Sequence, residues 1–156
     1  MKITKYPQSC LLLEKNNKQI VIDPGNLFTA EYDRSVLGEL AAVLITHKHG
    51  DHFDDDFLTE IIKEGVEVFS NSEVAGLLEG VKAIESGKAF EVAGFKVLPY
   101  DLPHCKVPEI YGIAHNTGYI IDATFFHPGD GIETSGLKIH DLAVPVAGPD
   151  ISFYRA

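Results

Sequence analysis

Tryptophan is absent from this chain of 156 residues, methionine occurs once, and cysteine occurs only twice, at Cys10 and Cys105. Two cysteines far apart in the sequence are too few for the disulfide framework on which small secreted domains depend. We therefore expect two reduced thiols, one buried and one near the functional site. A cytoplasmic location fits this cysteine usage.

Long apolar runs are missing as well. No stretch approaches the roughly 18 residues that a membrane-spanning helix needs, and the first residues lack the apolar core of a signal peptide. The composition, 45% hydrophobic and 23% charged, is typical of a globular protein. We expect one domain over residues 1–156 that is not associated with a membrane.

Basic residues are scarce: there are 13 lysines and arginines against 23 acidic residues, which gives a net charge of −10. So acidic a chain is a poor general binder of phosphate backbones. This argues against a nuclease, although bound metal ions could still hold a phosphate. The partner we expect is a small-molecule substrate rather than a nucleic acid.

Histidine, in contrast, is concentrated in one short segment, residues 46–52, with the sequence THKHGDH. It follows directly on an apolar run, residues 41–45, and a short buried strand is predicted over residues 41–46. Such a density of imidazoles is costly unless a metal neutralises and organises it. The alternative, a solvated loop that is histidine-rich by chance, does not account for the spacing.

The spacing within this segment predicts two neighbouring metal positions. On an extended backbone the side chains of His47 and His49 point the same way, so they can bind one ion. Gly50 permits a tight turn that directs Asp51 and His52 towards a second position. Imidazole and carboxylate ligands suit zinc, and also manganese or iron.

Lone histidines elsewhere are weaker candidates. His127, His115 and His140 are each expected to lie outside the metal site, although His115 could contact a substrate. Asp23 ends a strand before a Pro-Gly turn, and we expect its carboxylate to bond to backbone or to a ligand histidine. Cys105 could reach a metal, but a bystander thiol is the simpler interpretation.

The pattern His-x-His-x-Asp-His of residues 47–52 resembles the signature of the metallo-β-lactamase superfamily. Further segments extend this resemblance over nearly the whole chain: Asp23-Pro24-Gly25, Leu102-Pro103-His104 and Gly129-Asp130. Residues 7–9 and 141–146 resemble those of one branch, the small metal-dependent hydrolases that include the ascorbate-6-phosphate lactonase-like proteins.

The resemblance implies an α+β fold, the αβ/βα sandwich of two mixed β-sheets flanked by helices, with metals in a cleft at the sheet edges. It implies that His47, His49 and His104 hold a first metal. Asp51 and His52 would hold a second metal and Asp130 would bridge the two. The expected cofactors are up to two divalent ions per chain, zinc first, with manganese or iron as alternatives.

The implied activity is hydrolysis of a small ester, lactone or phosphate-containing metabolite by a metal-bound hydroxide, with Asp51 orienting the nucleophile or accepting its proton. Family members continue past residues 141–146 to a final histidine of the second site. We therefore expect the C-terminal part of the domain to be absent, the second metal to bind more weakly, and exposed apolar surface to favour a homo-oligomer. A catalytically weak metal-binding fragment or regulatory module and a phosphodiesterase or nuclease remain the alternatives.

Patterns along the chain also predict individual elements. A hairpin through Asn16-Asn17 joins strands 11–14 and 19–22. Asp54 caps a helix that stops at Gly65, and Ser72 caps a second helix as far as Leu78. Further strands are predicted over residues 66–69, 81–84, 89–92, 95–100, 117–121, 123–126 and 141–146.

Overall fold

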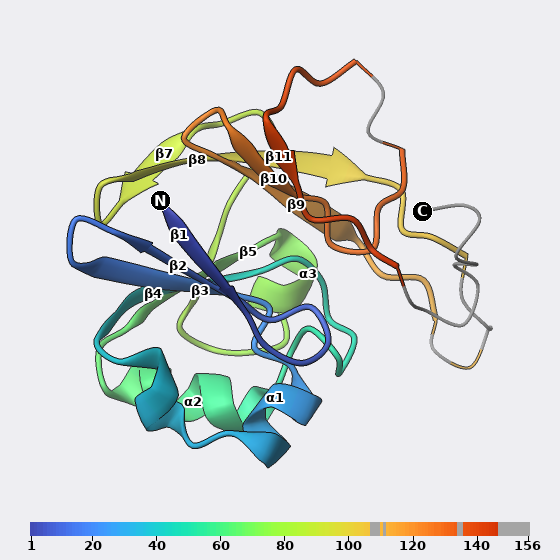
Figure 1. Cartoon of the computed structure of the whole chain (residues 1–156). Coiled ribbons are helices and arrows are strands. Elements are labelled where there is room, and N and C mark those ends of the chain that lie inside the picture. The colour runs from blue at the N-terminus through green and yellow to red at the C-terminus, as the bar shows by residue number, and fades with distance from the viewer. Residues whose placement is uncertain (107–109, 111, 134–135, 147–156) are drawn as a thin grey trace.

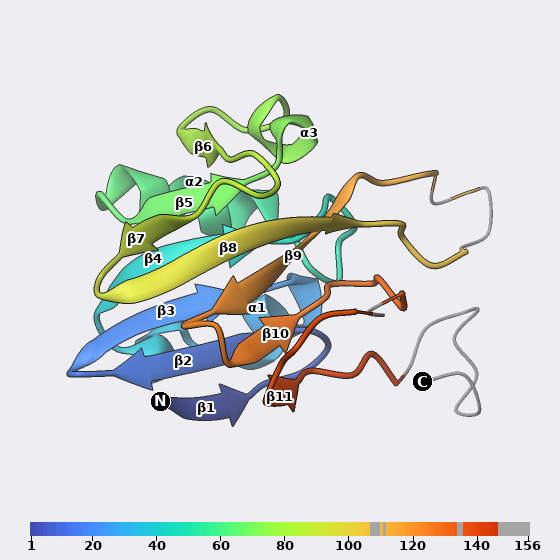
Figure 2. The ribbon, with the colours of Figure 1, turned by 90° about the horizontal axis from the view of Figure 1, so that it is seen from above.

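The computed structural model describes residues 1–106, 110, 112–133 and 136–146. Its two β-sheets lie face to face, and the helices pack beneath the first sheet (Figure 1). Viewed from above, the second sheet crosses over the first (Figure 2). This arrangement confirms the predicted α+β sandwich of two mixed sheets.

The first sheet contains six strands in sequence order: β1 (Lys2–Lys5), β2 (Leu11–Lys15), β3 (Lys18–Ile22), β4 (Leu40–Ile45), β5 (Glu67–Ser70) and β6 (Val81–Ala83). Strands β1 to β3 pair antiparallel, whereas β3 to β6 run parallel. The predicted β2–β3 hairpin is confirmed, because Asn16 and Asn17 both have positive φ, at 51° and 59°. Two left-handed residues are what a two-residue turn requires, and asparagine tolerates that conformation.

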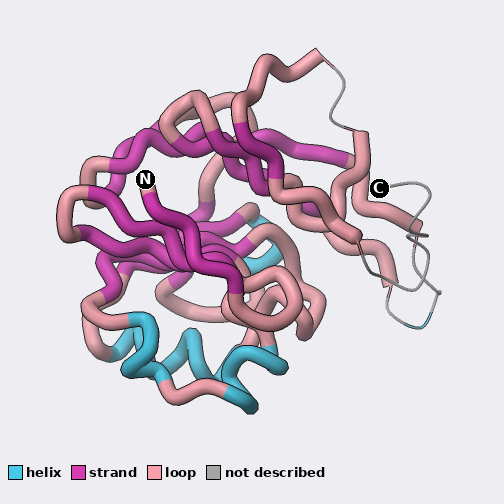
Figure 3. The backbone as a smooth tube through the Cα atoms, viewed as in Figure 1, coloured by secondary structure: helices cyan, strands magenta, loops and turns pink. Residues whose placement is uncertain are grey.

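The second sheet contains five strands: β7 (Phe90–Val92), β8 (Phe95–Leu102), β9 (Asn116–Ile121), β10 (Phe125–His127) and β11 (Asp141–Leu142). Their order is β11-β10-β9-β8-β7, with only β10 and β11 parallel. Strand β8 is the long strand of this sheet, and β9 pairs with it over six residue pairs. The C-terminal end of β8 leads into a loop, drawn in pink in Figure 3.

Four short helices connect the strands of the first sheet: α1 (Asn26–Glu31), the 3₁₀ helix η1 (Arg34–Leu37), α2 (Asp55–Lys63) and α3 (Ser72–Ala75). The predicted cap of α2 is confirmed, since the Asp54 side chain accepts a hydrogen bond from the Phe57 N–H. The predicted stop is confirmed too, because Gly65 follows with φ at 87°.

The core forms two layers on either side of the first sheet. Successive residues of a strand face opposite sides, so Leu12, Val21 and Val43 pack with the helices, whereas Leu13, Ile20 and Leu44 pack with the second sheet. Strands buried on both faces explain why these segments are almost continuously apolar. Burial of each aliphatic side chain contributes roughly 1.5–3 kcal/mol to the stability of the fold, so both layers of the core stabilise it.

Several predicted boundaries are wrong. Helix α3 is capped by Asn71 rather than Ser72, because the Asn71 carboxamide accepts from the N–H groups of Glu73 and Val74, and the helix ends at Ala75 rather than Leu78. The last strand covers Asp141–Leu142, not residues 141–146, because its pairing with β10 spans two residue pairs. Helices α1 and η1 are absent from the predicted elements. Within the described ranges, no helix is long and apolar enough to cross a membrane.

Candidate metal centre

The predicted metal-binding residues meet at one edge of the sandwich, where three strands end. Strand β4 delivers residues 47–52, β8 delivers His104, and β10 delivers Asp130. Hydrogen bonds join the two sheets at this edge: the Tyr119 hydroxyl donates to the Ile45 carbonyl at 2.6 Å, and the Thr117 N–H donates to the Thr46 carbonyl at 3.0 Å. The site therefore belongs to both sheets.

His47, His49 and His104 form the first donor group, with ligand atoms within 4.8 Å of one another. The Nε2 atoms of His47 and His104 are 3.2 Å apart. Two nitrogens bound tetrahedrally to one zinc at ~2.0–2.1 Å would be about 3.4 Å apart. The Nδ1 of His104 lies 2.6 Å from the Cys105 carbonyl, so Nδ1 carries the proton and Nε2 keeps its lone pair for a metal.

His47, His52 and Asp130 form a second donor group, also within 4.8 Å. The two oxygens of Asp130 face different groups. Oδ1 lies 3.2 Å from the Nε2 of His52, and Oδ2 lies 3.5 Å from the Nε2 of His104. A carboxylate with its two oxygens so placed could face two ions, and the bridging role that the family resemblance implies for Asp130 stays a prediction.

Asp51 lies at the rim of the centre. Its Oδ2 is 3.5 Å from the Nε2 of His52, and its side chain is 48% exposed. It belongs to none of the three-donor groups formed by the described residues. Burial raises the pKa of Asp51, but the hydrogen bond and charge of His52 outweigh this and leave it lowered. Asp51 is thus an ionised carboxylate that faces both the donors and solvent.

Asp23 supports the centre from beneath and is fully buried. Its Oδ2 lies 2.7 Å from the Nδ1 of His52 and accepts from the Thr46 hydroxyl at 2.7 Å, while Oδ1 accepts from the Thr46 N–H at 2.7 Å. The expected contact of Asp23 with backbone and with a ligand histidine is therefore present. It places the proton of His52 on Nδ1 and turns Nε2 towards Asp130.

Burial and neighbouring charges shift the pKa values of these groups. Burial lowers the pKa of His47, and the charge of His52 lowers it further, so His47 is neutral as a metal ligand must be. Burial also opposes protonation of His52, but Asp23 first, and then Asp130 and Asp51, raise its pKa well above the usual value. The pKa of Asp130 is raised by burial, but the hydrogen bond from His52 outweighs this and lowers it.

The donor set fits a divalent metal. The Nε2 atoms of His47 and His104 face each other at 3.2 Å, and the Asp130 carboxylate lies 3.5 Å from the second of them, so a cation between these lone pairs would relieve their repulsion. These are the ligand types that zinc, manganese and iron accept. The assignment of individual residues as ligands remains a prediction.

Two asparagines hold the loops of this centre, and sequence reasoning missed both. The Asn71 amide donates to the carbonyls of Thr46 and His115, at 3.1 and 2.8 Å. The Asn116 amide donates to the Pro128 carbonyl at 2.9 Å, and its oxygen accepts from the Asp130 N–H at 3.1 Å. The available signal for Asn71 was its position before Ser72, where it competes as the cap of helix α3. No local sequence pattern marks Asn116.

Gly25 lies directly against the metal loop. A Cβ atom at this position would overlap the backbone carbonyl of Asp51. The loop is also tied down by the Asn26 N–H, which donates to the Gly50 carbonyl at 2.8 Å. Only glycine allows the two backbones to approach so closely, which accounts for the turn after Asp23.

The remaining histidines lie outside the donor groups that the described residues form, and their expected absence from the metal site stays a prediction. His127 is buried, accepts from the Gly129 N–H at Nδ1, and directs Nε2 to the Ser9 carbonyl at 3.2 Å. His115 pairs with Asp101 at 3.0 Å, and His140 is exposed beside Asp141. Neither Cys10 nor Cys105 is in a disulfide, and both are buried.

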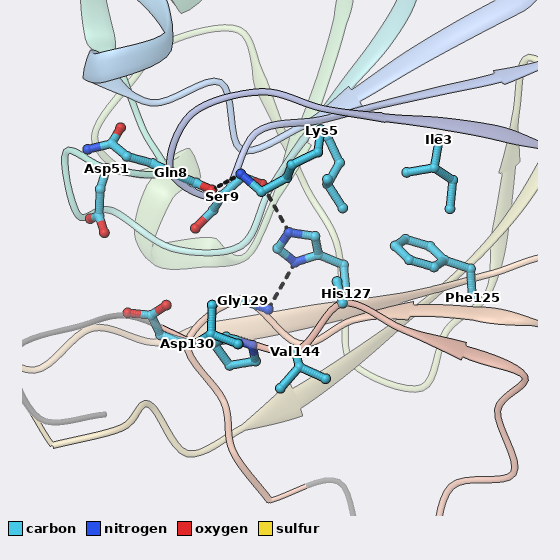
Figure 4. A pocket seen from close by; sticks show the side chains of 14 residues that line it. Ile3, Lys5, Gln8, Ser9, Asp51, Phe125, His127, Gly129, Asp130 and Val144 are labelled. Atoms are coloured by element: carbon cyan, nitrogen blue, oxygen red, sulfur yellow. Dashed lines mark hydrogen bonds between the residues drawn. The ribbon is translucent and has the colours of Figure 1, made fainter. Parts of the chain in front are cut away.

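A pocket of about 460 Å³ opens beside the centre, between strand β1 and the chain that follows β11. Figure 4 shows Asp51 and Asp130 at one end, His127 in the middle, and Phe125 and Ile3 at the other end. The pocket is mainly apolar, with these lining residues: Ile3, Lys5, Gln8, Ser9, Leu11, Asp51, Phe125, His127, Gly129, Asp130, Ala143, Val144, Pro145 and Val146. Two of the predicted ligands, Asp51 and Asp130, therefore line this pocket.

Two facing mixed sheets with a histidine-aspartate centre at their shared edge define a metallo-β-lactamase-type fold. Residues 2–152 match the family model of the β-lactamase superfamily domain. The chain belongs to this superfamily.

Relatives and solved structures agree with this assignment. The chain is 28% identical over 157 residues to Protein Rv0786c of Mycobacterium tuberculosis, covering 96% of this chain and 73% of that protein. It is 29% identical over 96 residues to a UPF0173 metal-dependent hydrolase of Staphylococcus aureus, covering 60% of this chain and 41% of that protein.

Among solved structures, one from Parabacteroides distasonis is 25% identical with a TM-score of 0.68. The metallo hydrolase Igni18 from Ignicoccus hospitalis is 24% identical with a TM-score of 0.63. Each structural match covers 83% of this chain and 60% of the other chain. The similarity to Igni18 shows that the two chains share a fold. The chain thus spans 41% of the Staphylococcus aureus relative and 60% of each of these solved chains.

Proposed function

We propose that this chain is a metal-dependent hydrolase of a small molecule and that it uses one or two divalent ions, zinc first, with manganese or iron as alternatives. The observation that carries the proposal is the carboxylate of Asp130. It lies between an imidazole of each donor group, 3.2 Å from His52 and 3.5 Å from His104. A divalent metal in such a site polarises a substrate oxygen and activates water near neutral pH.

The residues of the chain have distinct tasks in this proposal. His47, His49 and His104 would hold the first metal, and His52 would hold the second, with Asp130 shared. Asp23 holds the Nδ1–H of His52, so that Nε2 would become the ligand atom when a metal displaces its proton. These contacts fix the donors before a substrate arrives, and pre-organisation of this kind is a main source of catalytic power.

Asp51 is the candidate catalytic residue. Its carboxylate is ionised, half exposed, and lies where the pocket meets the donors. From this position it can accept a proton from the reacting water and orient that water towards the substrate. It is the predicted ligand that lies outside the three-donor groups formed by the described residues, and this favours a role as proton acceptor.

The pocket supports an ester or lactone more than a phosphate as the substrate. Its wall consists mainly of apolar side chains, including Ile3, Phe125 and Val144 (Figure 4). Lys5 is the one cation among its lining residues, and its ammonium already donates to the carbonyls of Tyr6 and Gln8. A substrate of a few carbons could place its carbonyl at the donors and its aliphatic part against this wall.

A panel of substrates tests the proposal. The metal-stripped protein receives zinc, manganese or iron(II), and is assayed with small esters, lactones and a phosphodiester. We expect turnover of an ester or lactone that requires metal and falls at least 100-fold in Asp51→Asn, as is typical for loss of a general base. The matched control is Asp55→Asn, the same change on the exposed first turn of α2, which should keep full activity.

Two outcomes contradict the proposal. Tight metal binding without turnover of any substrate would favour the alternative function, a regulatory metal-binding module. Turnover confined to the phosphodiester would favour a phosphodiesterase. The expected cytoplasmic location and the expected homo-oligomer stay predictions, and light scattering tests the second of these.

A further inference from the structure

Cys105 places a sulfur donor beside the candidate metal centre that the proposed function does not use. Its side chain is buried, with 8% of the residue exposed. The thiol is directed at the carboxylate of Asp130, with Sγ 4.0 Å from Oδ2. The backbone of Cys105 is fixed as well, because its N–H donates to the Asp130 carbonyl at 2.9 Å. The preceding residue, His104, forms an antiparallel β-bridge with Gly131.

The sulfur completes a third group of donors. Ligand atoms of His104, Cys105 and Asp130 all lie within 4.8 Å of one another. Sulfur at ~2.3 Å and a carboxylate oxygen at ~2.0–2.2 Å from one tetrahedral zinc would be about 3.6 Å apart. The observed 4.0 Å exceeds this only slightly, so a small rotation of the Cys105 side chain would suffice.

We propose that Cys105 supplies a thiolate ligand to the metal that His104 and Asp130 hold. The inference rests on the metal centre proposed above and adds a donor to it. On binding, the S–H bond of Cys105 breaks, a sulfur–metal bond forms, and the proton passes to solvent. No oxidant is needed, since the metal remains divalent and the sulfur keeps its oxidation state.

A thiolate changes which metals the centre prefers. Sulfur ligands favour zinc, cobalt and cadmium, whereas manganese prefers oxygen donors. Cys105 would therefore bias the centre towards zinc and release one more proton for each metal bound. The second cysteine cannot supply this donor, because Cys10 is packed in the apolar cluster between the first sheet and the helices, where burial raises the pKa of its thiol.

Cobalt(II) titration of the metal-stripped protein, followed by absorption spectroscopy, tests the proposal. Cobalt bound to a thiolate gives an intense near-ultraviolet charge-transfer band, while cobalt bound by nitrogen and oxygen alone gives only weak visible bands. We expect the intense band in the wild type and in the matched control Cys10→Ser. In Cys105→Ser the band should be lost, and the zinc affinity should fall by about 10- to 100-fold or more.

A second measurement guards against misfolding of the variant. In the unmodified protein, zinc should protect Cys105 from an alkylating reagent, with the modified residue identified by mass spectrometry. Equal alkylation with and without zinc would overturn the proposal. So would visible cobalt bands that lack the charge-transfer band, whereas the absence of any cobalt spectrum would refute the metal centre itself.

Discussion

The substitution Asp23→Asn tests how the metal centre is supported. It removes a buried charge that accepts three hydrogen bonds, from the N–H and the hydroxyl of Thr46 and from His52. Asparagine has the same shape and tolerates the positive φ of this position, 51°. The change therefore isolates the carboxylate from the backbone conformation.

The expected cost follows from the contacts. The amide oxygen of asparagine can still accept from His52 and the Thr46 hydroxyl, but its NH₂ group then faces the Thr46 N–H. A buried donor without an acceptor costs about 1–3 kcal/mol, and the two remaining hydrogen bonds lose their charge assistance. We expect the free energy of unfolding of the metal-free protein to fall by about 3 kcal/mol. At a urea slope near ~2 kcal/mol/M, the midpoint should fall by about 1.5 M.

The metal affinity should fall as well. Without the charge of Asp23, nothing holds the proton of His52 on Nδ1 as firmly, so zinc affinity should drop by about 10- to 100-fold. Urea denaturation with a chelator present measures the first effect, and zinc titration measures the second. The control is Asp33→Asn, in which an exposed cap that accepts from the Ser35 N–H is replaced by an equally good cap. If Asp23→Asn behaves like this control in both assays, the supporting role of Asp23 is refuted.

Three other predictions concern the folded chain. Gly25→Ala should force the backbone at Asp51 to move, so thermal denaturation should show a loss of at least about 2 kcal/mol and zinc titration a weaker site. Ala123→Gly should raise the free energy of unfolding in urea by about 0.5–1 kcal/mol, because Ala123 has φ at 56°; a loss would contradict the left-handed turn. Asp122→Asn removes the ion pair with Lys15. Burial raises the pKa of Asp122, but the Lys15 hydrogen bond outweighs this and lowers it. Asp122→Asn should therefore be less stable than the wild type by about 1 kcal/mol at pH 7. This difference should decrease as the pH falls below about 4 and disappear once Asp122 is protonated in the folded wild type. A difference in urea denaturation that is independent of pH would refute this account.

The part of the site that lies within one short segment was accessible to sequence reasoning, because the imidazoles of residues 47–52 follow a strand and share a turn. The contributions of His104 and Asp130 depend on which strands lie side by side. Alternation and spacing carry no such information, so these two residues came from a family resemblance. Asn116 bonds to the loop after β10 and also to the Leu102 carbonyl at the end of β8, and no local pattern marks a residue of that kind.

Elements with their own turn chemistry were predicted well. The Asn16-Asn17 hairpin and the Asp54 cap both depend on neighbours within a few residues. Helix α1 was missed because it has only six residues and no side-chain cap. Its position is fixed by Phe28, which packs in the core under the first sheet, and such tertiary packing overrides weak local preference.

The donors of the centre come from both sheets, and this has a consequence for the opening of the sandwich. An ion with ligands in the segment after β4 and in the loops after β8 and β10 would hold these three segments together. Like a covalent crosslink, a bound ion would close loops of about fifty to eighty residues between its ligands. A bound ion would then stabilise the closed sandwich against opening. Zinc should therefore slow the hydrogen exchange of the β4 and β9 amides more than that of the surface loops remote from the centre.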